Sequence, residues 1–451
     1  MASLDNRAFC FLKRQGVPVA FRRDCHAACF DRQGLAYSTN MDRRTFLKTA
    51  GVGMAALSLP AWLASAAENK PARRPPNIIL ILADDLGLGD VGCCGGHYPT
   101  PNLDALAKGG TRFEYSYSTP LCGPSRCQLL TGRYPFRTGL INNQSEMAIQ
   151  PKRDVMIQTV LKKAGYVTAS VGKWGQISHG PGQWGFDEYL VFPGSGVYRR
   201  EQKQEYWVNN ERKELGYKYL PDLMHDFLVD FLTRHQDQPF FIYYPMSHVH
   251  MPIIPTPDSQ PNASRAQLYA DNLAYMDKLV GKLVAELDRL KLRDNTLVLF
   301  TGDNGTADPF AKESTVNGRP LSGHKRVLLE GGSRVPLIAN WPGTTPAGVV
   351  NHDLTDFSDF FATCAELAGA ALPTGVTLDS HSFAPQLKGA KGQPRDWVYV
   401  ELDGASYACD KYYKLTNTGA LFDLKDAPFT EIPVPADTQD AAAMAARRRL
   451  K

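Results

Sequence analysis

The chain has 451 residues, of which 43% are hydrophobic and 21% are charged, and its formal net charge is +4. This length allows a large core, formed by one big α/β domain with a smaller appendage. The positive excess lies in residues 1–66, and the rest of the chain is close to neutral. The charge therefore gives no argument for nucleic-acid binding, and we expect no nucleic-acid partner.

Residues 41–66 have the pattern of a twin-arginine export signal. Arg43 and Arg44 supply the paired arginines, an apolar stretch follows from 49 to 63, and a small-residue cleavage site ends at Ala66. The apolar stretch is short for a bilayer span, so we expect a periplasmic or secreted protein without a membrane anchor in its mature form. A membrane anchor or a buried helix is the alternative interpretation. The twin-arginine translocase is then a partner.

Residues 1–40 contain three cysteines and scattered arginines but no hydrophobic periodicity. Because export signals lie at the N-terminus, we hypothesise that translation starts at Met41 and that residues 1–40 are a non-native extension. Six further cysteines follow residue 66 without the spacing of a zinc site. Disulfides are compatible with export, but the sequence does not specify any.

Strand-like and helix-like segments alternate along residues 75–390, which favours a doubly wound sheet flanked by helices. Continuous apolar runs predict buried strands at 77–83, 166–171, 240–244 and 296–300. Helical spacing predicts helices that start near residue 100 and that cover 154–164, 220–235 and 265–290.

The pattern of predicted secondary structure changes after residue 390. Short strand candidates at 397–401, 412–416 and 420–424 are separated by turns and predict a small antiparallel subdomain over 391–437. Residues 438–451 are expected to form an exposed helical tail.

Oxygen-bearing side chains follow two of the predicted strands. Asp84 and Asp85 come directly after the first strand, and Asp303 and Asn304 follow the strand at 296–300. Open α/β sheets bind their ligands at the carboxyl ends of strands, and hard oxygen ligands favour Ca²⁺ or Mg²⁺ over zinc. Each residue alone is compatible with a turn or a helix cap, but the set favours a metal site.

Cys122 opens the pentapeptide Cys-Gly-Pro-Ser-Arg, and the motif continues as Leu-Leu-Thr-Gly-Arg-Tyr-Pro over residues 129–135. Taken alone, Cys122 is compatible with a buried small hydrophobic residue. Together with the segments at 82–85, 100–104, 172–174, 250–252, 301–305 and 330–336, the motif resembles the type I sulfatases of the alkaline phosphatase superfamily. The resemblance covers residues 75–430, with a catalytic domain over 75–390.

The resemblance implies an alkaline-phosphatase-like fold with a large, mixed, mostly parallel sheet, and the activity of an arylsulfatase-like sulfuric ester hydrolase. It also implies that a maturase oxidises Cys122 to formylglycine. One hydroxyl of the hydrated aldehyde attacks sulfur and expels the alcohol. The other hydroxyl then loses its proton, so the aldehyde reforms and sulfate departs.

The resemblance also assigns roles to single residues. Asp84, Asp85, Asp303 and Asn304 match ligands of Ca²⁺, with Mg²⁺ the less favoured ion, and the modified Cys122 contacts the same ion. Arg126 matches the arginine that steadies the aldehyde, and Lys173 and Lys325 match lysines that hold sulfate oxygens. His250 matches the histidine of the leaving group, and Ser195 matches a sulfate-binding serine of some relatives. Arg326 competes with Lys325 for its role, and His248 competes with His250.

One position departs from the family pattern. The histidine that usually stands two residues after the first lysine is Gly175 here. We consider two hypotheses: His179 or another nearby donor replaces it as a substrate-binding group, or the site is retuned or weakened.

Two alternative functions keep the same fold. One is a phosphodiester or phosphonate ester hydrolase, and the other is an inactive homologue that binds sulfated glycans, which Gly175 motivates. The expected ligand is a sulfated small molecule or glycan, bound near variable loops at 192–210 and 258–266.

Overall fold

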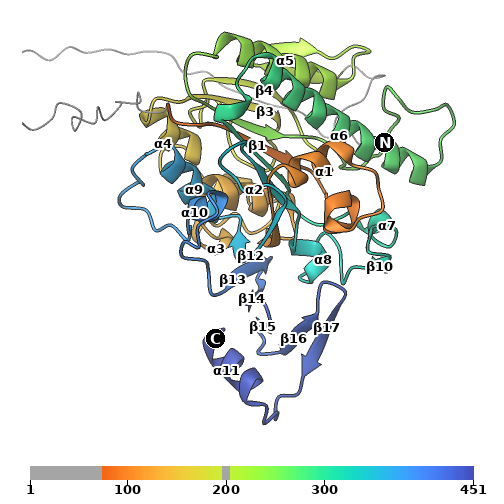
Figure 1. Cartoon of the computed structure of the whole chain (residues 1–451), viewed down its shortest axis with the longest axis vertical. Coiled ribbons are helices and arrows are strands. Elements are labelled where there is room, and N and C mark those ends of the chain that lie inside the picture. Colours follow the sequence, from red (N-terminus) through yellow and green to blue (C-terminus); the bar gives the residue numbers. More distant parts are fainter. Residues whose placement is uncertain (1–73, 196–203) are drawn as a thin grey trace, which may run out of the picture. The chain divides into compact units, whose positions relative to one another are not determined.

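A computed structural model describes residues 74–195 and 204–451 of the chain (Figure 1). The expected extension at 1–40 and the expected export signal at 41–66 lie outside these residues. Residues 71–451 cluster as one compact unit by their internal contacts. Within the described residues, no helix combines the length and the apolar character that a membrane span needs.

A ten-stranded sheet forms the centre of the fold. Its strands in spatial order are β12 (Val349–Asp356), β2 (Thr111–Tyr117), β11 (Leu337–Asn340), β8 (Thr296–Gly302), β1 (Asn77–Ala83), β7 (Phe240–Pro245), β3 (Val167–Lys173), β4 (Glu188–Phe192), β5 (Glu205–Val208) and β6 (Glu211–Glu214). The five strands from β8 to β4 are mutually parallel, whereas β11, β5 and β6 pair antiparallel to their neighbours. This mixed sheet with a parallel centre confirms the predicted fold class.

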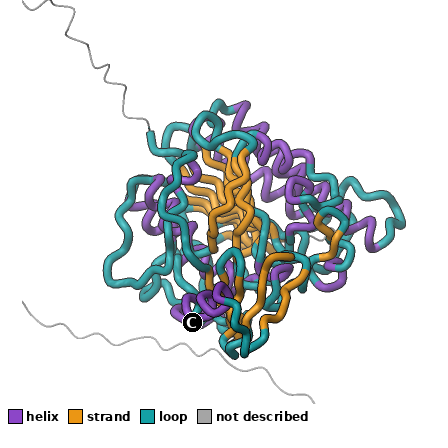
Figure 2. The backbone as a smooth tube through the Cα atoms, turned by 60° about the horizontal axis from the view of Figure 1, so that its bottom comes forward, coloured by secondary structure: helices purple, strands orange, loops and turns teal. Residues whose placement is uncertain are grey.

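Helices cover both faces of the sheet (Figure 2). One layer contains α1 (Pro101–Lys108), α5 (Leu220–Arg234) and α6 (Arg265–Arg289); the other contains α2 (Cys122–Thr131), α4 (Ile157–Lys163), α9 (Asp359–Leu367) and α10 (Ala384–Leu387). Alternate residues of β1 pack into different layers, Ile79 and Ile81 with α5 and α6, and Ile78 and Leu80 with α2 and α9. Because both faces of β1 are covered, the strand is apolar at every position.

The buried central elements lie close to their predicted bounds, and β1 coincides with its prediction. The helix predicted at 154–164 begins only at Ile157, because the Asp154 carboxylate accepts hydrogen bonds from the Gln150 amide and from Arg133 instead of entering the helix. Strands β2, β4, β5, β6, β11 and β12 of the large sheet were not predicted, and short helices α3 (Pro135–Thr138), α7 (Asp308–Ala311) and α8 (Glu330–Ser333) fill loops.

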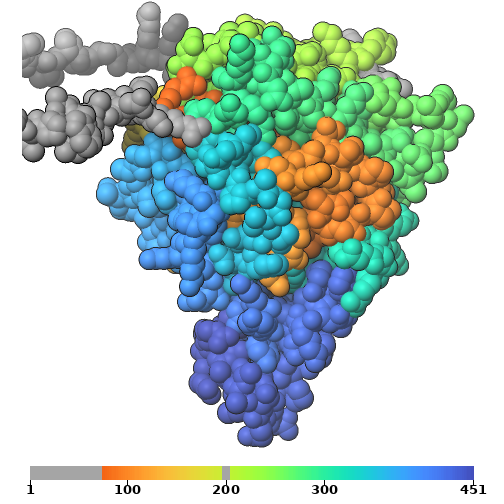
Figure 3. All heavy atoms as spheres, in the orientation of Figure 1, coloured from red at the N-terminus to blue at the C-terminus, as the bar shows by residue number. Residues whose placement is uncertain are grey.

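The C-terminal part contains a separate five-stranded antiparallel sheet with its strands in chain order. The strands are β13 (Val398–Leu402), β14 (Ala405–Cys409), β15 (Tyr413–Thr416), β16 (Leu421–Asp426) and β17 (Thr430–Val434). These residues, coloured blue in Figure 3, gather at one end of the described unit.

The C-terminal tail differs from its prediction. Residues 438–451 were expected to form an exposed helix, but α11 (Ala441–Arg449) buries Ala443 and Ala446, and Ala443 packs in one cluster with Leu415 and Leu421 of the small sheet. A helix with two small residues on one face can approach a sheet closely, so the segment belongs to the core of the subdomain.

The six cysteines among the described residues are all unpaired.

Candidate active site

The predicted acidic residues meet at one edge of the large sheet. Asp84 and Asp85 follow β1, Asp303 and Asn304 follow β8, and Lys173 is the last residue of β3. These parallel strands lie near one another in the order β8-β1-β7-β3, so their carboxyl ends face the same side. All five side chains are buried.

Each carboxylate has a basic partner. Lys173 Nζ lies 2.6 and 2.9 Å from the two oxygens of Asp84, and Lys325 Nζ lies 2.6 and 2.7 Å from those of Asp85. Nε and Nη2 of Arg126 donate to Asp303 Oδ2 at 2.9 and 2.6 Å. Three carboxylates and three cations therefore balance one another, which is what a buried cluster of charges requires.

The pKa shifts of Asp84 and of the two lysines favour their ionised forms. Burial alone would raise the pKa of Asp84, but Lys173, His250 and Arg126 outweigh it and lower that pKa. Burial would lower the pKa of Lys173, yet Asp84 raises it above the ordinary value, and Asp85 does the same for Lys325. The two lysines are therefore cationic at neutral pH.

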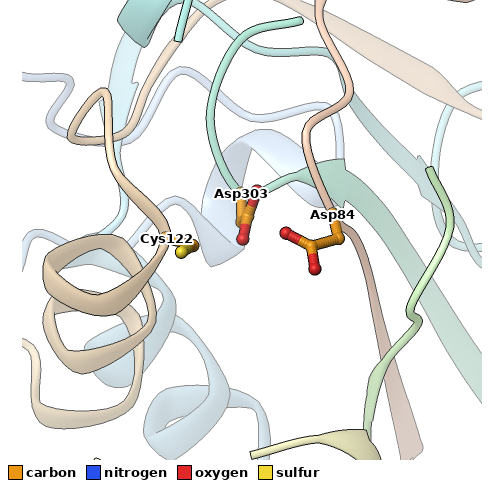
Figure 4. Close-up of side chains that lie close together, drawn as sticks. All are labelled: Asp84, Cys122 and Asp303. Carbon is orange, nitrogen blue, oxygen red and sulfur yellow. The ribbon is translucent and has the colours of Figure 1, made fainter. Parts of the chain in front are cut away.

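Cys122 is the first residue of α2 and is almost fully buried. Figure 4 shows its side chain and that of Asp84 on either side of Asp303. Ser125 Oγ donates to the Asp303 carbonyl at 2.5 Å and so ties the first turn of α2 to the end of β8. The N-terminal turn of a helix carries partial positive charge, so α2 presents Cys122 in a field that favours anions.

The site fits a hard divalent cation. Ligand atoms of Asp84, Cys122 and Asp303 lie within 4.8 Å of one another, and so do those of Asp84, Asp85 and His250. The Asn304 Oδ1 atom is buried without a hydrogen-bond partner among the described residues, whereas its Nδ2 donates to Asp85 and to the Gly305 carbonyl. An unpartnered carbonyl oxygen beside three carboxylates is a donor set that Ca²⁺ or Mg²⁺ prefers.

His250, rather than His248, lies at this site. His250 Nε2 is 3.9 Å from Asp85 Oδ2, and its Nδ1 lies 2.6 Å from the Met251 carbonyl, which can only accept a hydrogen bond. His248 is completely buried, and its Nε2 lies 2.9 Å from the Tyr219 hydroxyl. Burial lowers the pKa of His248 to about 3. The ring packs near Tyr219 and Tyr275, and the substrate-binding role predicted for it stays a prediction.

Lys325, rather than Arg326, lies where the second sulfate-binding cation is predicted. The Arg326 residue is exposed, and its described hydrogen bond runs from its backbone amide to the Pro120 carbonyl.

The structure does not bring His179 to the site. Its side chain is exposed, and its carbonyl accepts a hydrogen bond from Trp174 Nε1. Ser195 does lie near Cys122, through Gln176, which donates from Nε2 to Ser195 Oγ at 3.1 Å.

Two residues beside Cys122 were missed by the sequence analysis. Asn143 Nδ2 lies 3.4 Å from Cys122 Sγ, and Gln176 Oε1 lies 3.8 Å from the same atom. Gln176 could have been identified from the sequence, because it directly follows Gly175, where the chain departs from the family pattern. Asn143 lies in a loop without a motif, so the sequence offered no reason to select it.

The geometry agrees with comparisons to known proteins. A family model described as sulfatase matches residues 76–370. The chain belongs to the sulfatase family. N-acetylgalactosamine-6-sulfatase of Canis lupus familiaris is 35% identical over 74% of this sulfatase and 70% of the relative. Arylsulfatase A of Homo sapiens is 36% identical over 76% of this sulfatase and 72% of the relative.

Solved structures support the same assignment. The crystal structure of Ps i-CgsB in complex with k-i-k-neocarrahexaose is 28% identical, with a TM-score of 0.71, and the match covers 83% of this sulfatase and 92% of that chain. PsFucS1 sulfatase from Pseudoalteromonas sp. is 28% identical, with a TM-score of 0.68 over 81% and 83% of the two chains. This sulfatase is therefore an enzyme that hydrolyses sulfate esters.

Proposed function

We propose that this sulfatase removes sulfate from a sulfated carbohydrate, with a formylglycine made from Cys122 as its nucleophile and with bound Ca²⁺. The observation that carries this proposal is the position of Cys122, at the N-terminus of α2 and facing the strand-end carboxylates with their three basic partners (Figure 4). A structural cysteine in the core would not need such a polar, charged environment.

The basic residues would bind the sulfate group. Lys173, Lys325 and Arg126 place three fixed cations beside Cys122, and the neighbouring carboxylates raise the pKa of all three. Negative charge spreads over the non-bridging oxygens of sulfur during transfer. Preorganised cations that meet this charge lower the barrier, each by about 3–4 kcal/mol by analogy with oxyanion donors.

His250 would protonate the leaving alcohol. Because its Nδ1 donates to the Met251 carbonyl, Nε2 is the nitrogen that faces Asp85 and the site. Nε2 delivers a proton only when both ring nitrogens carry one, so the acid would be the imidazolium form, which becomes the neutral Nδ1–H ring once the alcohol has left. A positioned acid of this kind contributes a factor of about 10²–10⁴ to the rate.

The residues that would hold the cation are Asp84, Asp85, Asp303 and Asn304. When bound, a divalent ion supplies positive charge that stabilises the nucleophile as an anion and the sulfate oxygens. Ca²⁺ is favoured over Mg²⁺, because a buried set of carboxylate and amide oxygens replaces the water that Mg²⁺ gives up reluctantly.

A cavity beside the site supports a carbohydrate as the alcohol part of the substrate. Its volume is about 490 Å³, and Gly175 and Gly194, the neighbours of Gln176 and Ser195, contribute to its wall. Aromatic and amide side chains make up half of the lining: Trp174, Tyr189, Phe192, Trp207, Asn209 and Asn210. Such a combination of flat apolar faces and amides suits a sugar ring. The names of two relatives also support a carbohydrate substrate: one is named for N-acetylgalactosamine, and the other was solved in complex with k-i-k-neocarrahexaose.

Maturation and export complete the proposal. A formylglycine-generating maturase would convert Cys122 in the cytoplasm, and the twin-arginine translocase would then carry the folded enzyme to the periplasm or the medium. The sequence of residues 41–66 supports this order, because the twin-arginine pathway transports folded proteins.

Mass spectrometry of the tryptic peptide of residues 113–126 tests the proposal, on enzyme made together with a maturase. We expect the mass of an aldehyde in place of the thiol, and release of inorganic sulfate from sulfated oligosaccharides. The Cys122→Ala variant is the matched control and should release none. An unmodified thiol, in cells that convert a known sulfatase, would contradict the proposal.

A further inference from the structure

The loop after Lys173 is crowded at residue 175. A Cβ atom built on Gly175 would lie 3.0 Å from the Gly194 carbonyl oxygen, so a side chain there would require a shift of a few tenths of an ångström. As a glycine, residue 175 offers no side chain to Cys122, and the next residue contacts Cys122 instead.

Gln176 turns toward Cys122 instead. Its φ of 65° lies in the left-handed region, which redirects its side chain relative to a regular strand continuation. The Cys122 thiol points at Gln176 Oε1 at 3.8 Å, and Nε2 of the same amide donates to Ser195 Oγ at 3.1 Å. In this arrangement the Ser195 hydroxyl accepts from the NH₂ group of Gln176, and the amide oxygen faces Cys122.

A second amide contacts Cys122 with the opposite polarity. Asn143 Oδ1 accepts from the Gly123 backbone amide at 3.1 Å, so its NH₂ group faces Cys122 Sγ at 3.4 Å. Residue 123 must be small for this arrangement, since a Cβ there would lie 2.6 Å from Asn143 Oδ1 and 2.9 Å from Gln176 Cβ. Gly123 thus allows both amides to approach the nucleophile.

We propose that Gln176 is the positioning residue for the nucleophile of this sulfatase, in the place of a histidine, with Asn143 as its counterpart. This inference rests on the proposed conversion of Cys122. In the hydrated aldehyde, the position of Sγ is taken by a hydroxyl oxygen. Gln176 Oε1 accepts a hydrogen bond from this hydroxyl, and Asn143 Nδ2 donates a hydrogen bond to the hydroxyl oxygen. The two amides thereby stabilise the hydrate and hold its orientation.

The amide differs from a histidine in one chemical respect. It is neutral across the working pH range and cannot exchange a proton with the substrate. Gln176 therefore acts by orientation alone, and removing its hydrogen bond should lower kcat more than it raises KM.

The test compares Gln176→Met, which keeps the volume of the side chain but removes the amide, with the matched control Gln183→Met. Gln183 lies in the same loop, is exposed, and accepts a hydrogen bond from the Gly180 amide through its side-chain oxygen. The aldehyde content of each variant is measured on the peptide of residues 113–126, and rates are expressed per aldehyde. We expect kcat to fall by about 10²-fold in Gln176→Met, in line with a misplaced reacting group, and to stay unchanged in Gln183→Met.

An aminooxy probe gives a second readout that does not depend on turnover. The probe condenses with the free aldehyde and releases water, so it reacts more slowly when the hydrate is favoured. Loss of one neutral hydrogen bond to the hydrate should speed labelling of Gln176→Met by about two- to tenfold. Gln176→Glu retains acceptor oxygens, so its labelling should stay near the wild-type rate, while its negative charge raises KM for a sulfate ester.

These outcomes separate the two proposals. Wild-type labelling or wild-type kcat in Gln176→Met, with aldehyde present, would overturn the role of Gln176 and leave the sulfatase mechanism intact. Absence of the aldehyde in the wild-type enzyme would instead overturn the proposed function on which the inference rests.

Discussion

Arg126 shows how single residues of this site combine structure with chemistry. Its guanidinium is completely buried, donates twice to Asp303 and once, from Nη1, to the Lys173 carbonyl at 3.2 Å. It thereby connects the ends of β8 and β3 through a residue of α2. A planar group with five donors can satisfy these partners together, which a lysine cannot.

We predict that Arg126→Met destabilises the protein by about 3–5 kcal/mol, because it leaves the buried Asp303 carboxylate without its partner. Chemical denaturation in EDTA would measure the loss without a contribution from bound metal. Arg137→Met is the control: Arg137 pairs with Asp379 near the surface, with 35% of its side chain exposed, and such pairs contribute at most about 1 kcal/mol. Equal losses in the two variants would contradict the prediction.

The sequence predicted residues of this site that belong to motifs, but not those whose role depends on loop conformation. Asp84 and Asp303 follow apolar runs that can only be buried strands, so their meeting at one sheet edge was foreseeable. Gln176 and His179 stand three residues apart in one loop, and only its left-handed turns decide which of them faces Cys122. His248 and His250 likewise differ by side-chain direction alone.

At the scale of elements, burial decided which predictions held. Long strands with both faces covered are apolar throughout and were recognised, as β1 and β8 were, whereas the equally buried β11 has only four residues and was missed. Edge strands such as β6 expose every residue and have no hydrophobic pattern, so they were missed. The same reasoning explains α11, whose contact face consists of alanines that a hydrophobic pattern does not mark.

For α11 we predict that Ala446→Asp lowers the unfolding midpoint of the protein. Ala446 is completely buried, and an unpaired charge there costs several kcal/mol or expels the helix. Ala442→Asp is the matched control, because Ala442 is exposed in the first turn, where an acidic residue is neutral or slightly stabilising. Thermal unfolding followed by circular dichroism would compare the two; equal midpoints would show that α11 does not contribute to the core.

At the scale of the whole molecule, the strand-end cluster couples the large sheet to α2 through charge. The three carboxylates come from β1 and β8, and the cations that balance them come from α2, β3 and the loop that holds Lys325. These segments are far apart in the sequence, so the cluster forms only when the domain is folded. Any ion that binds the cluster therefore binds the folded state alone and must stabilise it.

We accordingly predict that Ca²⁺ raises the unfolding temperature of the metal-free enzyme, with a free energy that grows by about 1.4 kcal/mol for each tenfold increase above Kd. Mg²⁺ at the same concentration should stabilise less, because it keeps its water and demands a stricter geometry. Asn304→Ala removes the unpartnered Oδ1 atom, so its stabilisation should begin at a higher Ca²⁺ concentration. Differential scanning calorimetry of enzyme treated with EDTA and then titrated with each ion measures all three effects. Since the charges of the cluster already balance, the metal-free enzyme should remain folded. Identical unfolding transitions with and without Ca²⁺ would show that the carboxylates pair with the basic residues and bind no ion.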